Sequence, residues 1–597
     1  MLLKVWLGMV LMVCVLTGCS TMPKRPENLP RGDYTYTTDY ISWLARSEMN
    51  KHGITGLSIA LVDDRQVVWA AGFGFADKAG NVPATAETVY RAGSISKLFT
   101  ATAIMQLAEQ GLLDIDKPLQ NYLPEFSIKS RFPDAGPITQ RNIMTHHSGI
   151  PSDLLKGAWS KNPEPFTNVV NLLREGHVAY PPDFVNSYSD LGVSVLGHAL
   201  EKVVGRGYVS HMTTALLRPL GMADSSFSQA PDHSPAASKA YRNGEEAEDT
   251  PLRDIPAGGL NSTVLDLSRF MQMILAGGRA GERQIIKTET LAEMLRPQNE
   301  TVALDLSFRI GLGWMLGGQG DIDIRNAGPI AHHSGITLYH RSMLIVLPEQ
   351  KLGVVVLSNS ATGTDAVLKL ATEALKAALE AKSGIRQPER ETAGTGAGTT
   401  TRAELQVYAG RYATDVGVVT LNKKTDQLQA KIMNKTLSFV PRADGLLGLQ
   451  YKLLGLIPIS LGELDRVGIG RTTIAGRDIV TSRLDGQELL FGERIADTQL
   501  PEAWLKRQGE YEIINAGDDY LLVKGIHLRY DAGLLVMEYE LPLFSKSKMS
   551  VALNPLNNTE ALILGLGRGM GETIRVVSVG GDDLLQFSGY LLRKKHD

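Results

Sequence analysis

The stretch that decides the fold reads Ala92-Gly93-Ser94-Ile95-Ser96-Lys97. Apolar residues at helical spacing follow it as far as Gly111, so we expect a helix with Ser94 in its first turn. Lys97 lies three residues beyond Ser94 and shares its face of the helix, and a helix N-terminus favours negative charge on the serine oxygen. The pattern predicts a serine nucleophile beside a lysine. The alternative is that Ser94 only caps the helix.

Two later motifs favour catalysis at Ser94. The tetrapeptide Ser-x-x-Lys is weak evidence alone, because the chain repeats it at Ser545-Lys546-Ser547-Lys548, where nothing around it indicates a catalytic setting. After Ser94 come Tyr188-Ser189-Asp190 and then His333-Ser334-Gly335. This order resembles that of penicillin-binding proteins and serine beta-lactamases. For Tyr188 the alternative is a half-buried aromatic residue, with Ser189 or Asp190 as a helix cap.

The wider resemblance is to the class C beta-lactamase-like group of serine hydrolases, over about residues 36–379. That group also contains D-alanyl-D-alanine carboxypeptidases, D-aminopeptidases and esterases. Besides the Ser94 motif, the stretches that carry the resemblance are Met144-Thr145-His146-His147-Ser148-Gly149-Ile150, Ala257-Gly258-Gly259-Leu260-Asn261-Ser262-Thr263, Gly311-Leu312-Gly313-Trp314 and the strand pair from Met343 to Asn359.

The resemblance implies a role for each motif. Ser94 would attack a carbonyl carbon, Lys97 and Tyr188 would move the proton, and the backbone N–H groups of Ser94 and Ile336 would form the oxyanion hole. A serine hydroxyl needs an adjacent base, and a lysine with an ordinary pKa of about 10.4 serves as one only if its surroundings lower that pKa. The substrate-binding positions that the resemblance implies are Asp190, His333, Ser334 and Gly335.

Two of these positions depart from the family pattern. The family usually has asparagine where this chain has Asp190, and a carboxylate cannot donate a hydrogen bond to a substrate carbonyl. Its negative charge near Lys97 would also favour the ammonium form and make a poorer base. His333 stands in place of a lysine whose fixed charge attracts a substrate carboxylate, and histidine is only partly charged at neutral pH. The change at Asp190 puts beta-lactam recognition in doubt, though not the Ser/Lys/Tyr chemistry itself. The His-x-Gly form resembles aminopeptidase and esterase branches more than dedicated beta-lactamases.

The chain of 597 residues is long enough for several domains. An expected hairpin around Asp63-Asp64-Arg65 and a strand pair at 341–347 and 352–357 enclose mostly helical sequence, and a helix closes the region at 365–381. We therefore expect an α+β domain at 34–382: a beta-lactamase/transpeptidase-like antiparallel sheet flanked by helices, with a helical subdomain beside it. Ser94 would lie between the two parts, where small-molecule sites are common.

Residues 383–402, which are rich in Gly, Thr, Pro and charge, read as a linker. In residues 403–597 short alternating runs such as 417–421, 478–484, 520–523 and 534–539 are separated by turn residues, which predicts a β-rich domain, either a barrel or a sandwich. Gly410-Arg411-Tyr412 and Gly509-Glu510-Tyr511 open similar segments and hint at two halves. The region resembles the lipocalin-like barrel appended to some family members.

The N-terminus reads as an export signal. Lys4 precedes an apolar run from Val5 to Leu16 that is short for a membrane-spanning helix, which needs about 20 residues. The following Leu16-Thr17-Gly18-Cys19 resembles the lipobox of bacterial lipoproteins. The resemblance implies a signal peptide at 1–18, a lipidated Cys19, a tether at 19–33 and membrane attachment through acyl chains. Ser20 after the cysteine resembles the pattern for the outer membrane, with the protein facing the periplasm.

Other partners and cofactors find little support. A net charge of −3 and the lack of a basic stripe argue against nucleic acid. No HExxH motif or cysteine pair accompanies the histidine pairs His146-His147 and His332-His333, so we expect no metal and no cofactor. The run from Gly565 to Gly571 lacks the lysine and spacing of a phosphate loop and reads as a flexible turn.

The sequence therefore predicts a serine hydrolase that forms an acyl-enzyme on an amide, peptide or ester bond. Its substrate would be a small peptide, a D-amino-acid derivative or an ester, which peptidoglycan could supply. The alternative is a catalytically inactive envelope lipoprotein that binds peptidoglycan or another ligand.

Overall fold

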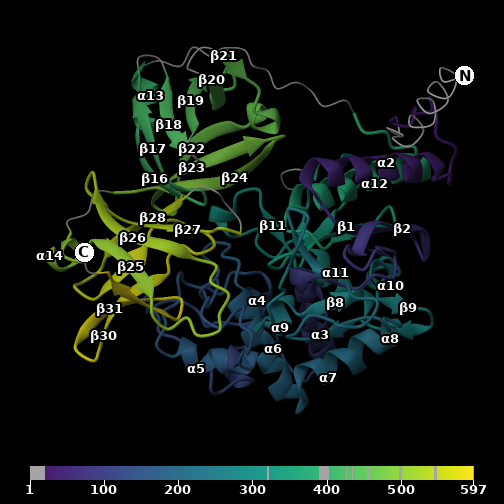
Figure 1. Cartoon of the computed structure of the whole chain (residues 1–597), viewed down its shortest axis with the longest axis horizontal. Helices are drawn as coiled ribbons and strands as arrows, with labels where there is room; N and C mark the ends of the chain where they lie inside the picture. The colour runs from purple at the N-terminus through teal and green to yellow at the C-terminus, as the bar shows by residue number, and fades with distance from the viewer. Residues whose placement is uncertain are drawn as a thin grey trace, which may run out of the picture.

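The computed structural model describes residues 21–318, 322–388, 402–424, 427–432, 435–453, 457–496, 500–543 and 548–595. Three parts follow one another along the chain (Figure 1): an N-terminal domain, residues 21–388, in purple to teal; a first barrel, residues 402–496, in green; and a second barrel, residues 500–595, in yellow. Cys19, the second Ser-x-x-Lys copy at Ser545 and residues 389–401 of the expected linker lie outside the described residues.

An eight-stranded antiparallel sheet forms the centre of the N-terminal domain, in the order β11-β12-β13-β14-β15-β1-β2-β3. The neighbouring strands β14, β15 and β1 are apolar almost throughout and buried, as expected of strands covered on both faces. The hairpin expected at Asp63-Asp64-Arg65 joins β1 to β2, and Asp64 takes a left-handed φ of 52° there. The strands are β1 (Gly56–Asp63), β2 (Gln66–Asp77), β3 (Val82–Pro83), β11 (Arg309–Ile310), β12 (Met315–Leu316), β13 (Ala331–Ile336), β14 (Arg341–Leu347) and β15 (Leu352–Ser358).

Helices cover both faces of this sheet. On one face α2 (Thr35–His52) and α12 (Thr364–Ser383) lie together, as Figure 1 shows at the upper right, and they share an apolar cluster with the strands. On the other face α10 (Val264–Leu275) and α3 (Ser96–Glu109) enclose a larger apolar cluster. Both α2 and α12 end at a left-handed glycine, the usual helix stop. The α+β prediction of a sheet flanked by helices is confirmed.

The helical part of the domain lies on the α3 side of the sheet. Its main helix α6 (Asp190–Val204) begins at the N-cap Ser189, whose Oγ accepts a hydrogen bond from Gly192 N–H at 2.8 Å. The other helices are α4 (Gln140–Met144), α5 (Val169–Leu173), α7 (Tyr208–Met212), α8 (Arg218–Leu220), α9 (Ile255–Gly258) and α11 (Thr288–Leu295). Small strand groups complete it: β4 (Tyr90–Arg91) with β8 (Leu260–Ser262) and β5 (Ser226–Phe227), β6 (Ala240–Arg242) with β7 (Glu245–Ala247), and β9 (Arg279–Ala280) with β10 (Arg283–Gln284).

The N-terminal segment 21–33 is irregular and lies against α12. Arg25 forms an ion pair with Glu380, and Gly32 N–H donates to Ala381 O at 3.0 Å. In the described part of the chain, no helix combines the length and the apolar character that crossing a bilayer requires.

The first barrel begins after the helix α13 (Arg402–Tyr408). Eight strands close into a ring, because β16 pairs with β24 and β19 pairs with β20, and β21 adds to β20 outside the ring. Inward-facing apolar side chains form its own core. The strands are β16 (Gly410–Thr414), β17 (Gly417–Lys423), β18 (Leu428–Ile432), β19 (Lys435–Pro441), β20 (Leu447–Leu453), β21 (Ile457–Ile459), β22 (Gly468–Ile474), β23 (Arg477–Leu484) and β24 (Gln487–Arg494).

The second barrel repeats this plan after the helix α14 (Glu502–Leu505), with β25 pairing with β32 to close it. The strands are β25 (Gly509–Ile513), β26 (Lys524–Asp531), β27 (Leu534–Glu540), β28 (Lys548–Pro555), β29 (Glu560–Ile563), β30 (Thr573–Val579), β31 (Asp582–Phe587) and β32 (Tyr590–Lys594). The β-rich C-terminal prediction is therefore confirmed, and of its two alternatives the chain forms barrels. The strand predicted at 520–523 is wrong, since this stretch is a loop that docks on the N-terminal domain, where Tyr520 N–H donates to Trp159 O at 2.8 Å.

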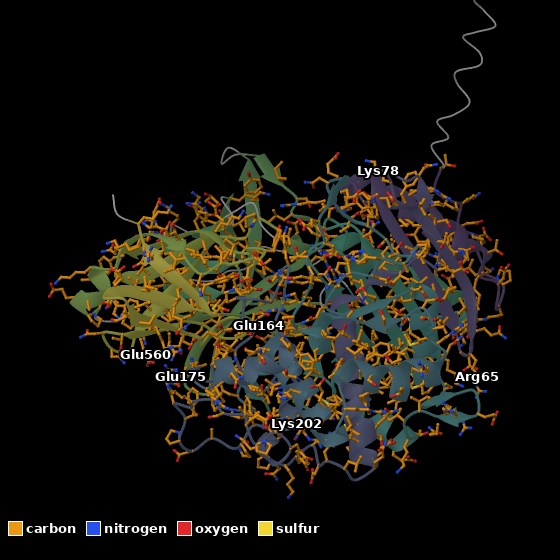
Figure 2. The ribbon with its side chains drawn as sticks, turned by 60° about the horizontal axis from the view of Figure 1, so that its bottom comes forward. Arg65, Lys78, Glu164, Glu175, Lys202 and Glu560 are labelled. Atoms are coloured by element: carbon orange, nitrogen blue, oxygen red, sulfur yellow. The ribbon has the colours of Figure 1, made fainter. Side chains whose placement is uncertain are left out.

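The second barrel packs directly on the N-terminal domain. Its core cluster takes in Tyr180 and Leu304 of that domain, together with neighbouring apolar residues. Polar contacts lie at the edge of the interface: Arg131 forms an ion pair with Glu560 at 3.1 Å, and Arg575 donates a hydrogen bond to the backbone carbonyl of Glu175. Figure 2 labels Glu175 and Glu560 on the two sides of this border. The apolar centre and polar rim indicate a fixed contact.

Candidate active site

Ser94 lies in a 3₁₀ turn, Gly93–Ile95, between β4 and α3. Gly93 takes a φ of 56°, and a Cβ at this position would lie 2.8 Å from Ile336 N. Glycine thus allows the turn to touch β13 and to adopt the left-handed conformation. The N-cap residues of the turn and of α3 are Ala92 and Ile95, so Ser94 caps neither.

Lys97 points back at Ser94 from the first turn of α3. Its Nζ lies 2.9 Å from Ser94 Oγ, 2.8 Å from Ala257 O and 2.6 Å from Asp190 Oδ1, and only 3% of its side chain is exposed. Burial by itself favours the neutral amine, but Asp190 and Tyr188 outweigh it and raise the pKa of Lys97 above its ordinary value. The lysine therefore rests as an ammonium group that donates to the serine oxygen.

Tyr188 lies beside this pair, just before the N-cap of α6. Its ring centroid is 4.8 Å from Lys97 Nζ and 4.1 Å from the centroid of the His146 ring. Burial raises the pKa of the Tyr188 phenol, while the Lys97 charge opposes that rise. In the resting site Tyr188 is therefore a neutral phenol next to a cation.

The strand β13 forms the opposite wall. His333 and Gly335 are buried whereas Ser334 and Ile336 are exposed, as the alternation of a strand requires. A Cβ at Gly335 would lie 2.0 Å from Ala92 O, so glycine permits the approach of β13 to the Ser94 turn. Burial lowers the pKa of His333 to about 3, and Lys97 adds to this effect. His333 is thus neutral and supplies no fixed positive charge.

These four segments bring every sequence-predicted site residue except Cys19 into one place. A family model described as Beta-lactamase matches residues 43–379 of this chain, which is more than half its length. The chain belongs to the beta-lactamase family.

Named relatives of this beta-lactamase family member include two bacterial proteins. The D-alanyl-D-alanine-carboxypeptidase/endopeptidase AmpH of Escherichia coli is 25% identical over 51% of this chain and 79% of its own. Penicillin-binding protein 4 of Amycolatopsis lactamdurans is 26% identical over 59% of this chain and 92% of its own.

Solved structures share the fold over more of the chain. An octameric penicillin-binding protein homologue from Pyrococcus abyssi has a TM-score of 0.51 and 24% identity, over 76% of this chain and 98% of its own. A structure titled SurE with D-Leu has a TM-score of 0.53 and 20% identity, over 77% of this chain and 99% of its own. At these identities the likeness establishes the fold alone.

Asp190 contacts two cations, Lys97 and Arg568. Its Oδ1 contacts Lys97, and its Oδ2 lies 3.1 Å from Nη2 of Arg568. Burial disfavours the charge, but Lys97 and Arg568 outweigh that cost and hold the pKa of Asp190 below its ordinary value. The residue is therefore a carboxylate and accepts hydrogen bonds only.

Arg568 is the site residue that the sequence did not reveal. It belongs to the loop 564–572 between β29 and β30 of the second barrel, the glycine-rich run that the sequence indicated only as a turn. Besides Asp190 it binds both oxygens of Asp153, at 2.9 and 3.1 Å, and its guanidinium carbon lies 4.9 Å from the Tyr188 ring centroid. No local sequence signal marks either Arg568 or Asp153 as a site residue.

A small cavity of about 60 Å³ opens in front of Ser94. Carboxylates of Asp153 and Asp190 line one side, and the exposed Ile336 lines another. Its apolar walls are Leu155, Ala158, Trp159 and Leu252 of the N-terminal domain and Leu522 of the second barrel. Both parts of the chain therefore shape the space that a substrate group would enter.

The neighbouring histidines point in different directions. His147 Nε2 lies 2.7 Å from Asp305 Oδ2, while His146 Nδ1 accepts a hydrogen bond from Ser189 N–H at 3.2 Å. Burial lowers the pKa of His146 well below its ordinary value, and Lys97 adds to the effect. Across the described ranges, no three His, Cys, Asp or Glu side chains gather with the spacing of a metal site.

Proposed function

We propose that this protein is a serine hydrolase that works through an acyl-enzyme on Ser94. The observation that carries the proposal is the 2.9 Å contact between Ser94 Oγ and the buried Lys97 Nζ, in a cavity that both parts of the chain enclose. A serine hydroxyl is a weak nucleophile unless a base lies within hydrogen-bond reach, and this pair meets that requirement.

The proposed reaction has two halves. Ser94 Oγ attacks the substrate carbonyl carbon and loses its proton to the Lys97–Tyr188 pair, which delivers a proton to the departing amine or alcohol. Water then attacks the acyl carbon, and its proton returns to Ser94 Oγ as the acid leaves. The backbone N–H groups of Ser94 and Ile336 would stabilise the negative oxygen in each half, and one such donor is worth about 3–4 kcal/mol.

The resting charges set the pH dependence of this mechanism. Because Asp190 raises the pKa of Lys97, the neutral amine that accepts the serine proton is a minority at neutral pH. The rate of acylation should therefore rise as the pH rises towards that pKa. The reaction would run through this minority form.

For the substrate we propose a small peptide, amide or ester with a D-amino acid or a small apolar group next to the scissile bond. The apolar walls and small volume of the cavity support a small group. The relative from Escherichia coli is named a D-alanyl-D-alanine-carboxypeptidase/endopeptidase, and one structural neighbour is titled with D-Leu. Lipidation at Cys19 would place the enzyme at the bacterial outer membrane, close to peptidoglycan peptides.

A second candidate is a catalytically inactive envelope lipoprotein that binds such a ligand. The ion pair between Lys97 and Asp190 favours it, since a lysine held as an ammonium is a poor base. This candidate predicts ligand binding without a covalent adduct.

Intact-mass detection of fluorophosphonate labelling separates the two candidates. The protein would be the soluble chain from Ser20 onward, beside Ser94→Ala and Lys97→Ala, with Ser545→Ala from the second Ser-x-x-Lys copy as the matched control. We expect one adduct on the wild type and on Ser545→Ala, and none on the two site variants. A folded wild type that takes no adduct would reject the hydrolase and leave the binding protein.

A further inference from the structure

The second barrel adds a positive charge to the proposed catalytic centre. Arg568 comes from the loop 564–572 of the second barrel and contacts Asp190, whereas the motifs that the sequence indicated all lie in the N-terminal domain. Its guanidinium binds Asp190 through Nη2 at 3.1 Å and Asp153 through both Nη2 and Nε. An arginine can hold two carboxylates in this way because its donors form a rigid planar fork.

The loop is anchored on both sides of Arg568. Gly569 N–H donates to Ser152 Oγ at 2.8 Å, and Ser152 N–H donates to Glu572 Oε1 at 2.8 Å. Ahead of the arginine, the Tyr180 hydroxyl donates to Gly565 O at 2.9 Å. The backbone that carries Arg568 is therefore bonded to the loops that border the site.

Asp190 stands between the two cations. One oxygen binds Lys97 and the other binds Arg568, so the carboxylate is shared. Without Arg568, the second oxygen of Asp190 would lose its partner, and the carboxylate could turn both oxygens towards Lys97. A nearby opposite charge typically moves a pKa by 1–3 units.

We propose that Arg568 is a positioning residue that acts on Lys97 through Asp190, holding one oxygen of the carboxylate so that Lys97 can release its proton and serve as the base for Ser94. The inference rests on the proposed hydrolase function. It assigns the second barrel a part in the chemistry.

Several other charged or titratable groups face this cluster and stay in place in the test below. From the N-terminal domain these groups are Tyr188 before α6, His146 after α4, His333 on β13, and Asp153 in the loop next to the second barrel. The Arg253–Asp254 ion pair before α9 also belongs to that domain. From the second barrel comes Glu572, in the same loop as Arg568. His146 and His333 are neutral, since burial lowers the pKa of each. The only partners of Arg568 that the described residues show are the two carboxylates and the Tyr188 ring.

A purely structural role for Arg568 is the competing explanation. The side chain is 49% exposed, and the two parts are already joined by an apolar cluster and by other ion pairs such as Arg131–Glu560 and Lys156–Asp519. A salt bridge at the solvent-exposed edge of a contact contributes little to the free energy of unfolding. A purely structural role would also leave the pH dependence of the labelling rate at Ser94 unchanged. That pH dependence is therefore the quantity that the test measures.

The test is the pH profile of the second-order rate of fluorophosphonate labelling at Ser94, for the full soluble chain. We compare wild type, Arg568→Gln, Arg568→Lys, Asp190→Asn and the double variant Asp190→Asn/Arg568→Gln. Arg575→Gln is the matched control, because Arg575 also joins the second barrel to the N-terminal domain, through Glu175. Thermal unfolding checks that each variant is folded.

We expect Arg568→Gln to move the acid limb of the profile to higher pH by about one unit, which slows labelling about tenfold on that limb. Asp190→Asn should move the limb the other way. In the Asp190→Asn background the effect of Arg568→Gln should fall to less than half. Arg568→Lys, which keeps the charge without the fork, should show a smaller upward shift, and this variant carries the test if the glutamine variant does not fold. Arg575→Gln should match the wild type.

Three results would overturn the inference. An Arg568→Gln profile that coincides with an active wild type, or a change confined to KM for an activated ester, shows that Arg568 does not act on the base. An Arg568→Gln shift that is equally large in the wild-type and the Asp190→Asn backgrounds shows that it does not act through Asp190. A wild type that takes no label at any pH removes the proposed hydrolase function itself, a failure distinct from the other two.

Discussion

Replacing Gly335 by alanine tests how closely β13 must approach the Ser94 turn. A Cβ on Gly335 would lie 2.0 Å from Ala92 O and 2.2 Å from Ser342 Oγ, and real Cβ atoms essentially never approach closer than 3.0 Å. The two segments must therefore separate by at least about 1 Å, the difference between 3.0 and 2.0 Å. The neighbour cannot simply rotate away, because Ala92 O is a backbone atom that accepts a hydrogen bond from Ser342 Oγ at 2.8 Å.

This separation acts on stability and on catalysis differently. Overpacking of this kind costs about 1–3 kcal/mol of unfolding free energy. The next residue, Ile336, carries the N–H group proposed for the oxyanion hole, so a shift of about 1 Å moves that donor away from the oxygen. Losing one oxyanion donor lowers kcat about 100- to 1000-fold, or about 3–4 kcal/mol. We therefore expect a folded but moderately destabilised enzyme whose kcat falls by about two orders of magnitude or more.

The assay is kcat for an activated ester, beside the free energy of unfolding. Gly136→Ala is the matched control, since a Cβ there would meet nothing within 4 Å and the residue has no left-handed φ. Ser342→Ala removes the hydroxyl that donates to Ala92 O but adds no atom between the two segments, so it should lose less activity than Gly335→Ala. A Gly335→Ala enzyme with wild-type kcat would refute the argument that this close approach positions the oxyanion hole.

Two further predictions concern buried titratable groups. In the proposed mechanism the phenol beside Lys97 helps to move the proton of Ser94. Tyr188→Phe should therefore lower kcat for an activated ester about 100- to 10,000-fold with KM little changed, and an unchanged kcat would exclude that role. Burial raises the pKa of Glu572 to about 7, so the folded protein keeps a proton that the unfolded chain releases above a pKa of about 4.3. The free energy of unfolding should therefore fall by about 4 kcal/mol in all as the pH rises through this window, and then level off. About 2.5 kcal/mol of this fall lies between about pH 5 and about pH 7.5, where denaturant unfolding measures it. Glu572→Gln, which keeps an acceptor for Ser152 N–H, should remove this contribution, and an unchanged fall in the variant would contradict the assignment.

Local patterns are sufficient for much of the N-terminal domain. The periodic apolar run after Ser94 predicts α3, and the Asp63-Asp64-Arg65 turn predicts the β1–β2 hairpin. Such features depend on residues close together in the sequence, whose apolar or turn-forming character can be read directly. The helix α3 itself is buried on nearly all sides and not on one face. The contact of Lys97 with Ser94 follows from the same helical spacing, and it stands in the structure at 2.9 Å.

The barrels are predictable only in part. Alternating runs indicate strands, but closure depends on pairing β16 with β24 and β25 with β32, which are far apart in the sequence. The Gly-x-Tyr openings do stand at equivalent places, since Gly410 begins β16 and Gly509 begins β25, and both tyrosines donate to the carbonyl four residues earlier. The run 520–523 is apolar at every position because the loop that carries it packs on both sides. Tyr520 and Leu522 contact an apolar cluster of the N-terminal domain, and Leu521 and Val523 contact the core cluster of the second barrel. The pattern therefore reports a docking contact instead of a sheet.

Asp190 shows why the electrostatics of this site lie outside any local pattern. The sequence correctly indicates that a carboxylate there raises the pKa of Lys97, yet the field at Lys97 is the sum of all charges around it, whatever their distance along the chain. Arg568 lies 378 positions beyond Asp190 and reaches it only because the second barrel packs on the loop around Ser152. The N-terminal domain taken alone would keep Ser94, Lys97 and Tyr188 but would leave the second oxygen of Asp190 without its arginine. The proposed active site therefore has its full set of charges, with Asp190 bound by both Lys97 and Arg568, only when the second barrel is present. This gives the second barrel a part in the proposed chemistry.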